Sequence, residues 1–172
     1  MRETTTATWS LETGAPEHTQ AAAELLGREL AGGDVVGLVG GLGTGKTCFT
    51  QGLARGLGVD PSEYVRSPTF ALINTHRGRV DLYHVDLYRL EDPDESLYIG
   101  YEDLFDGRAV VAIEWFDRFP DLWPANFLDL TFCALSGDGR RITARAQGER
   151  PARILERWRG VWEATRRRQT PP

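Results

Sequence analysis

The most constraining feature of this 172-residue chain is the segment 35–56, where an apolar run enters a glycine-rich loop. Val35–Val39 is short, apolar and mostly β-branched, which predicts a buried strand. Residues 40–47 follow the pattern Gly-x-x-x-x-Gly-Lys-Thr, the spacing of a phosphate-binding loop. Apolar residues then recur at helical spacing, so a helix is predicted to begin at the lysine. The segment therefore predicts a strand, a glycine loop and a helix in direct succession.

This succession suits the binding of nucleotide phosphates. Glycines let backbone N–H groups turn toward a phosphate, and the N-terminus of the next helix adds partial positive charge. Lys46 is predicted to hold the β- and γ-phosphates, and the hydroxyl of Thr47 to be a magnesium ligand. The loop residues predicted to bind the nucleotide are Gly41, Leu42, Gly43, Thr44, Gly45, Lys46 and Thr47.

Lys46 is the single lysine of a chain with 19 arginines. The chain thus has lysine at the one position where a compact ammonium suits phosphates better than a broad guanidinium fork. With no second lysine, the chain also lacks the Asn-Lys-x-Asp segment that reads guanine in GTP-binding switches. The first observation favours a nucleotide site, and the second argues against a GTP-binding switch.

Composition predicts a cytoplasmic protein with no membrane span. No apolar stretch approaches 18 residues, and the N-terminus lacks a basic and then apolar signal region. Residues 80–121 carry 12 acidic side chains and 3 arginines, whereas residues 140–168 carry 10 arginines and 3 glutamates. This balance does not favour an autonomous nucleic-acid binder, and the basic segment is interpreted as a solvated helix face.

Periodicity and chain breakers place the other elements. Strands are expected at 7–11, 71–75, 80–88, 109–113, 127–135 and 140–146, and further helices at 16–31 and 151–168, with 93–105 helical in part. Strands alternate with helices near the loop and pair as hairpins elsewhere. The prediction is a single α/β P-loop NTPase domain with a mixed parallel and antiparallel sheet flanked by helices over residues 1–155. Residues 156–172 form the end of the last helix and a basic tail.

Two carboxylates are candidates for magnesium binding and for positioning the attacking water. Such groups belong at the carboxyl end of a strand beside the loop strand. Glu114 follows the apolar run 109–113, which resembles a Walker B strand with Glu in place of Asp. Asp86 follows the run 80–85, which alternates apolar and polar residues and looks half exposed. The residues leave open which carboxylate positions the water, and His84 is interpreted as structural or exposed.

Five motifs, in this order and spacing, resemble the bacterial TsaE (YjeE) family, the ATPases of tRNA threonylcarbamoyladenosine biosynthesis. They are Gly-Leu-Gly-Thr-Gly-Lys-Thr (41–47), Ser-Pro-Thr-Phe (67–70), His-Val-Asp-Leu-Tyr-Arg-Leu (84–90), Ile-Glu-Trp (113–115) and Gly-Arg-Arg-Ile (139–142). The resemblance covers roughly residues 10–155 and implies ATP and Mg²⁺ as cofactors. It also implies TsaD and TsaB subunits as partners in threonylcarbamoyl transfer, with tRNA contacted indirectly through that complex.

The resemblance also implies roles for individual residues. Lys46, Glu114 and Asp86 would be catalytic, and Thr47 and Glu114 would coordinate magnesium. Further residues implied are Thr69 in a switch-like loop, Trp115 beside the metal ligand, and Thr19 and Arg140 near the nucleoside end of ATP. From the residues alone, Thr69 fits a plain Ser-Pro-Thr turn nearly as well. Gly41, Thr44 and Cys48 depart from the family's usual Asp, Ala and Thr or Ser, which puts any role of that Asp in doubt.

Two other classes of function remain as alternatives. A small-molecule P-loop kinase can be as short as this chain, but its loop usually lies near the N-terminus, and no arginine-rich lid insertion is present here. A nucleotide-sensing scaffold would bind ATP and hydrolyse it negligibly alone. That reading overlaps the family resemblance, because a partner can be required to complete the site.

Overall fold

The computed structural model describes residues 6–68, 70–95 and 100–169. Its strands are β1 (Thr6–Thr13), β2 (Val35–Val39), β3 (Ile73–His76), β4 (Leu82–Asp86), β5 (Val110–Glu114), β6 (Phe127–Ala134) and β7 (Arg140–Gln147). The α-helices are α1 (Pro16–Glu29), α2 (Lys46–Gly56) and α4 (Glu149–Gln169). The short 3₁₀ helices are η1 (Tyr101–Phe105), η2 (Phe116–Arg118) and η3 (Pro120–Leu122).

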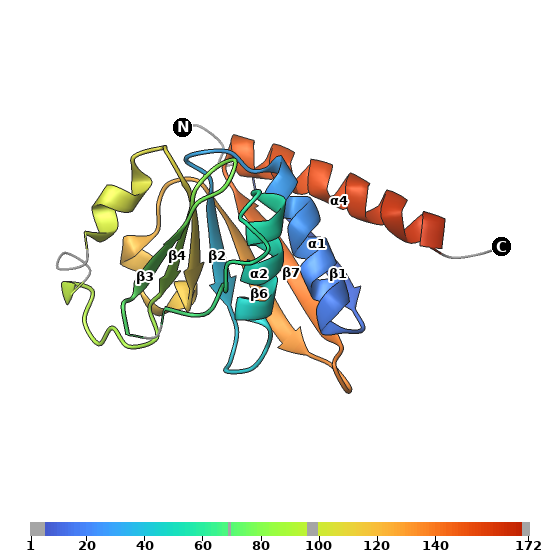
Figure 1. Ribbon diagram of the computed structural model, residues 1–172, viewed down its shortest axis with the longest axis horizontal. Helices are drawn as coiled ribbons and strands as arrows, with labels where there is room; N and C mark the ends of the chain where they lie inside the picture. Colours follow the sequence, from blue (N-terminus) through green and yellow to red (C-terminus); the bar gives the residue numbers. More distant parts are fainter. Residues whose placement is uncertain (1–5, 69, 96–99, 170–172) are drawn as a thin grey trace.

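In the described residues, seven strands form one sheet in the order β1-β7-β6-β2-β5-β4-β3 (Figure 1). β2 runs parallel to both of its neighbours, β5 and β6, and β4 runs parallel to β5. The pairs β1–β7, β6–β7 and β3–β4 are antiparallel. The predicted mixed sheet is confirmed. Its parallel centre brings the carboxyl ends of β2, β5 and β4 to one edge, where ligands bind in sheets of this kind.

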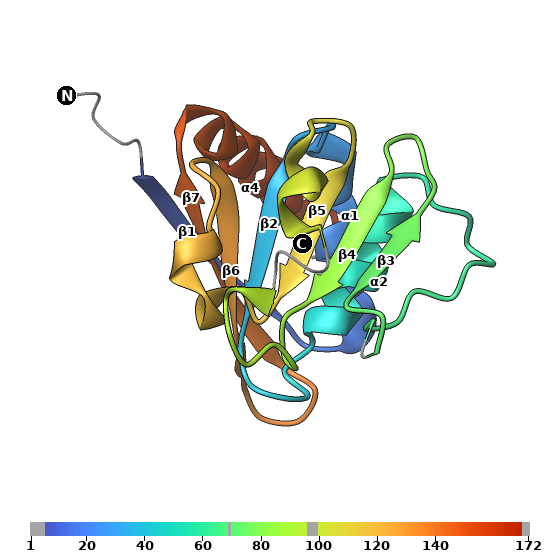
Figure 2. The same cartoon turned by 90° about the vertical axis from the view of Figure 1, so that its left-hand side faces the viewer.

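The two faces of the sheet are covered differently. α1 and α2 lie side by side over one face, and α4 packs on α1 and near the β1–β7 edge (Figures 1 and 2). Buried apolar side chains of these helices and of the sheet form the larger core cluster, which includes Leu26, Phe49 and Trp158. The opposite face packs against loops and the 3₁₀ helices, with Phe116 fully buried there.

Close helix packing fixes the position of α2, the helix that follows the glycine loop. A Cβ atom built on Gly52 would lie 2.2 Å from the carbonyl oxygen of Gln20, and one on Gly56 would lie 2.2 Å from that of Glu24. Only glycine allows the two backbones to approach so closely. α1 therefore supports the helix that carries Lys46 and Thr47.

The expectation that the run 80–85 is half exposed is wrong. β4 spans Leu82–Asp86 and lies between β3 and β5, and its polar residues His84 and Asp86 are buried. Alternation shows that two faces differ in polarity, but both faces of an interior strand can be covered.

Residues 96–99 of the acidic segment lie outside the described residues, and η1 is its described helical part. No helix in the described part of the chain has the length and apolar character needed to cross a membrane.

Candidate functional site

The glycine loop joins β2 to α2 and is held by left-handed backbone conformations. Gly43 has φ of 71° and Gly45 has φ of 105°, values that residues with a side chain rarely adopt. The hydroxyl of Thr44 donates to the carbonyl oxygen of Gly41 across the turn, at 2.8 Å. Arg140 of β7 donates from Nε to the carbonyl oxygen of Thr44 at 2.9 Å. The loop is thus stabilised by a hydrogen bond within it and by another from Arg140, 96 residues away in the sequence.

Lys46 is buried inside the loop, with 5% of the residue exposed. Its Nζ donates to the carbonyl oxygens of Gly40 and Gly41, at 2.6 and 2.7 Å, and lies 4.2 Å from the centroid of the Trp115 ring. Burial lowers the pKa of the Lys46 ammonium, and the nearby carboxylates, Glu114 first, partly offset that shift. The ammonium therefore points into the turn where phosphates are predicted to lie.

Glu114 ends β5 next to the loop strand and is 3% exposed. Thr47 donates its hydroxyl to Glu114 Oε1 at 2.9 Å. His84 Nε2 lies 2.8 Å from the same oxygen and donates to it when it carries the hydrogen. The predicted metal ligands Thr47 and Glu114 are therefore in direct contact.

Asp86 ends β4 and lies opposite Glu114 in the parallel register of β4 and β5. It is 6% exposed and accepts hydrogen bonds from the hydroxyl of Ser67 and from the backbone N–H of Tyr88, the latter at 2.9 Å. The two candidate carboxylates thus end adjacent strands on the loop side of the sheet. Trp115, which follows Glu114, has φ of 60° and packs against Tyr88, with ring centroids 4.9 Å apart and ring planes tilted by 38°.

These groups surround one cavity of about 390 Å³, a volume typical of small-molecule sites. Its lining residues are Leu42, Gly43, Gly45, Lys46, Thr47, Cys48, Ser67, Asp86, Tyr88, Glu114 and Trp115. Among the described residues, no group of three or more His, Cys, Asp or Glu side chains forms a metal cage. The donor set fits Mg²⁺, because that ion is usually held by one or two carboxylates together with substrate phosphates and water.

The remaining predicted residues occupy different places. Thr19 is buried and bonds to the Thr13 hydroxyl at 2.7 Å, and neither residue lines the cavity. Arg140 contacts the loop backbone, as described above. Thr69 lies outside the described residues. The nucleoside contacts implied for Thr19 and Arg140 stay predictions.

Sequence reasoning missed the contacts of His84 and Ser67 with the two carboxylates. Residues two apart on a strand share a face, so a His-x-Asp pair on β4 could have indicated that both side chains belong to the site. The contact between His84 and Glu114 could not be read in this way, because it depends on which strand lies beside β4. Ser67 reaches Asp86 from a loop, where no periodic signal exists.

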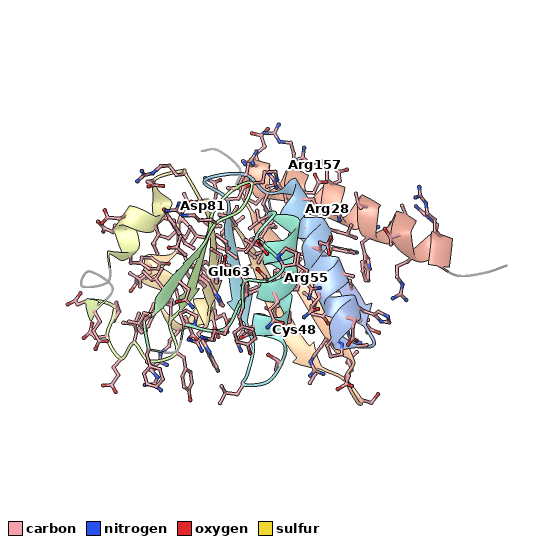
Figure 3. The ribbon with its side chains drawn as sticks, in the orientation of Figure 1. Arg28, Cys48, Arg55, Glu63, Asp81 and Arg157 are labelled. Atoms are coloured by element: carbon pink, nitrogen blue, oxygen red, sulfur yellow. The ribbon has the colours of Figure 1, made fainter. Side chains whose placement is uncertain are left out.

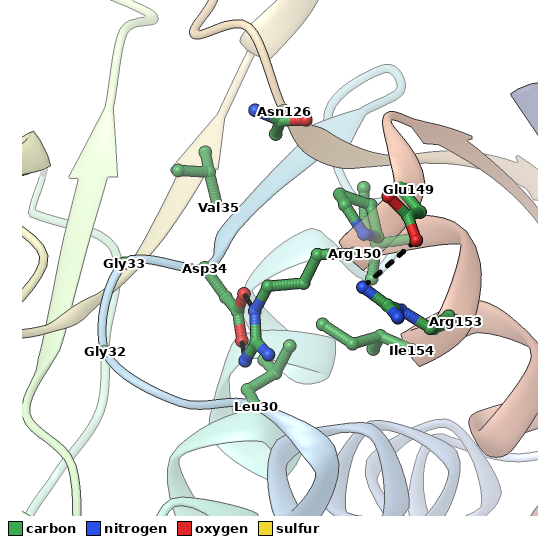
Figure 4. Close-up of a pocket in the computed structure, with 12 residues that line it drawn as sticks. Leu30, Gly32, Gly33, Asp34, Val35, Asn126, Glu149, Arg150, Arg153 and Ile154 are labelled. Carbon is green, nitrogen blue, oxygen red and sulfur yellow. Dashed lines mark hydrogen bonds and ion pairs between the residues drawn. The ribbon is translucent and has the colours of Figure 1, made fainter. Parts of the chain in front are cut away.

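A second cavity, of about 470 Å³, lies at the opposite end of β2 (Figure 4). Its charged side chains pair with each other: Arg150 donates to Asp34 at 2.6 and 2.8 Å, and Arg153 lies 3.4 Å from Glu149. The Arg150–Asp34 pair ties the start of α4 to the turn before β2, and the Arg153–Glu149 pair lies within α4. The smaller cavity, which holds the glycine loop and the two carboxylates, is therefore the candidate functional site.

Fold and site together define the class: an α/β protein whose glycine-rich loop, buried lysine and two strand-end carboxylates share one cavity. Residues 13–142 match the family model described as "Threonylcarbamoyl adenosine biosynthesis protein TsaE". The chain belongs to the TsaE family.

Individual relatives agree with this assignment. The chain is 39% identical to the tRNA threonylcarbamoyladenosine biosynthesis protein TsaE of Bacillus subtilis over 142 residues, 82% of this chain and 87% of that protein. It is 40% identical to the protein of the same name from Treponema pallidum, over 69% of this chain and 87% of that protein. A crystal structure of Bacillus subtilis YdiB superposes with a TM-score of 0.78 at 32% identity, covering 91% of this chain and 97% of that one.

Proposed function

We propose that this protein is an ATP hydrolase that supports the threonylcarbamoyl transferase complex of TsaB and TsaD. That complex forms threonylcarbamoyladenosine next to the anticodon of tRNA. One observation carries the proposal: Lys46, Thr47, Glu114 and Asp86 converge on the cavity at the carboxyl ends of β2, β5 and β4. A lysine for phosphates and carboxylates for metal and water are the groups that ATP hydrolysis requires.

The contacts of these four residues support a separate role for each of them. Lys46 holds the β- and γ-phosphates with an ammonium that otherwise donates to glycine carbonyls. Thr47 and Glu114 hold Mg²⁺, which supplies charge neutralisation at the phosphates. Asp86 is already oriented by Ser67 and Tyr88, and it supports hydrolysis by orienting the attacking water.

Dependence on a partner is consistent with the surface around the cavity. Leu42 and Tyr88 both line the cavity and are 74% and 43% exposed. Large apolar side chains exposed beside a site are typical of surfaces that contact another protein. We propose TsaD and TsaB as the partners, tRNA contacted only through them, and the cytoplasm as the location.

The test is ATP turnover of the purified protein, measured alone and with TsaB and TsaD counterparts and substrate tRNA. We expect low turnover alone and a strong increase with the complex. In the same assay, Glu114→Ala should keep part of the ATP binding and lose magnesium-dependent turnover, and full turnover in this variant would move its role to Asp86. The kinase alternative would be supported if ATP turnover of the wild-type protein did not change when the complex is added, or if phosphate were transferred to an added metabolite.

A further inference from the structure

Two histidine–carboxylate contacts lie on neighbouring strands, and one of them involves Glu114. His84 Nε2 lies 2.8 Å from Glu114 Oε1, the oxygen that also accepts the Thr47 hydroxyl. A second histidine, His76, has its ring centroid 6.3 Å from that of His84. Its Nδ1 contacts the carboxylate of Glu63, in the segment between α2 and β3 (Figure 3). The contact of His84 with Glu114 and the contact of His76 with Glu63 are therefore separated only by the gap between the two rings.

Strand register brings the two histidines together. In the antiparallel pair of β3 and β4, His76 lies opposite Leu82 and His84 lies opposite Asn74. Because residues two apart share a face, His76 and His84 are diagonal neighbours on one face. Leu82 of that face belongs to the core cluster beneath α1 and α2. His76 is 4% exposed and His84 is fully buried, so both rings are removed from bulk water.

One nitrogen of each ring has no hydrogen-bond partner within the described residues: Nε2 of His76 and Nδ1 of His84. The 6.3 Å separation is too long for a direct N–H···N bond, because each ring nitrogen lies only about 1.2 Å from its centroid. When Nδ1 of His76 donates to Glu63 and Nε2 of His84 donates to Glu114, the two remaining nitrogens of neutral rings are both acceptors.

We propose that His84 is a positioning residue that fixes the Glu114 carboxylate. The inference rests on the proposed function in one respect, the role of Glu114 in hydrolysis. Thr47 is the other donor to this oxygen and is itself a predicted metal ligand. When the Thr47 hydroxyl binds the metal ion instead, His84 is therefore the donor that still holds the Glu114 carboxylate. Such outer partners orient metal-binding side chains in many sites.

The first arm of the test uses variants of the full chain with its partner complex. His84→Leu removes the donor and keeps an apolar side chain in the buried position, whereas His84→Gln keeps an N–H group near the position of Nε2. We expect His84→Leu to keep ATP affinity within about twofold and to lose about 10- to 100-fold in kcat. His84→Gln should recover most of that kcat. His18→Gln, at an exposed histidine of α1, is the matched control and should match the wild type.

A purely structural role for His84 predicts a different result. Both variants would then unfold at lower temperature and lose ATP binding and turnover together, with no selective recovery in His84→Gln. Wild-type kcat in His84→Leu, or equal losses in the two variants, would overturn the positioning role.

The second arm needs no activity and no variant. Nitrogen-15 NMR of the imidazole rings in the wild-type protein reports which nitrogen carries the hydrogen, and the chain has only three histidines to assign. We expect the hydrogen on Nε2 in His84 and on Nδ1 in His76. A hydrogen on Nδ1 of His84 with none on Nε2 contradicts the inference. If the complex shows no turnover at all, the proposed function fails while this spectrum still decides the tautomers.

Discussion

At the scale of single residues, the site depends on a few polar side chains whose neighbours hold them in place. Lys46 is the single lysine of the chain, and its ammonium contacts two loop carbonyls and the face of the Trp115 ring. Burial lowers its pKa, but three nearby carboxylates act in the opposite direction. The ammonium shares the turn with two side-chain donors, the Thr44 hydroxyl and Arg140.

Replacing Lys46 tests the nucleotide site directly. Lys46→Ala removes the charged donor, and we expect ATP affinity to fall by roughly 100-fold or more, since hydrogen bonds to charged groups contribute about 1.5–3 kcal/mol each. Isothermal titration calorimetry with ATP and Mg²⁺ measures the change. Arg55→Ala, at an exposed position of the same helix, is the control and should bind as the wild type does. Unchanged affinity in Lys46→Ala would refute the site.

At the scale of elements, α2 is positioned by its contact with α1 as well as by the loop. Gly52 and Gly56 of α2 lie against backbone atoms of α1, so the two backbones approach closely at these positions. α1 and α2 together contribute much of the larger core cluster. Any change that separates the helices would move the first turn of α2, which carries Lys46 and Thr47.

A pair of glycine substitutions measures this contact. In Gly52→Ala the new Cβ would lie 2.2 Å from a carbonyl oxygen of α1, and overpacking of this kind costs about 1–3 kcal/mol of unfolding free energy. Gly160→Ala, in α4, is the matched control because no atom lies within 4 Å of its new Cβ. Alanine there should stabilise by about 0.5–1 kcal/mol through helix propensity. Urea unfolding compares the two variants, and equal effects would contradict the close packing of α1 on α2.

At the scale of the whole molecule, α4 joins the C-terminal part of the chain to the core. Trp158 is fully buried, donates from Nε1 to the carbonyl oxygen of Ala22 at 2.8 Å, and packs edge-on against Trp9. α4 passes through residues 155 and 156 without a break. The basic side chains of its last turn, Arg166–Arg168, lie on a helix whose other side is core.

Two truncations separate these roles of α4. Deleting residues 156–172 removes Trp158 and Trp162, and we expect a loss of at least about 3–5 kcal/mol of unfolding free energy, the cost of losing a buried tryptophan. Deleting residues 166–172 removes only the basic end and should change stability by less than about 1 kcal/mol. Thermal unfolding measures both effects. If complex formation and turnover survive the shorter deletion, the basic end is a solvated helix face. Loss of the complex would instead assign it a partner.

Local sequence patterns were sufficient to predict the phosphate-binding loop, the class of fold and the family. A buried strand, a glycine turn with positive φ and an amphipathic helix each depend on neighbouring residues, so they can be read from 35–56. Glu114 and Asp86 could be proposed as carboxylates because each ends a strand pattern. Hairpins and apolar runs likewise predicted a mixed sheet, although the ends of several elements shift by one to two residues or more.

Tertiary structure decided which of these residues meet. His84 reaches Glu114, 30 residues away, because β4 and β5 are parallel neighbours, and Arg140 reaches Thr44 because β7 begins beside the loop. The burial of β4 also came from its interior place in the sheet, since alternation of polarity is the same for covered and exposed faces. Sequence periodicity records which side of its own element a residue occupies. Strand order and register determine what lies on that side, and they arise only when the whole chain packs.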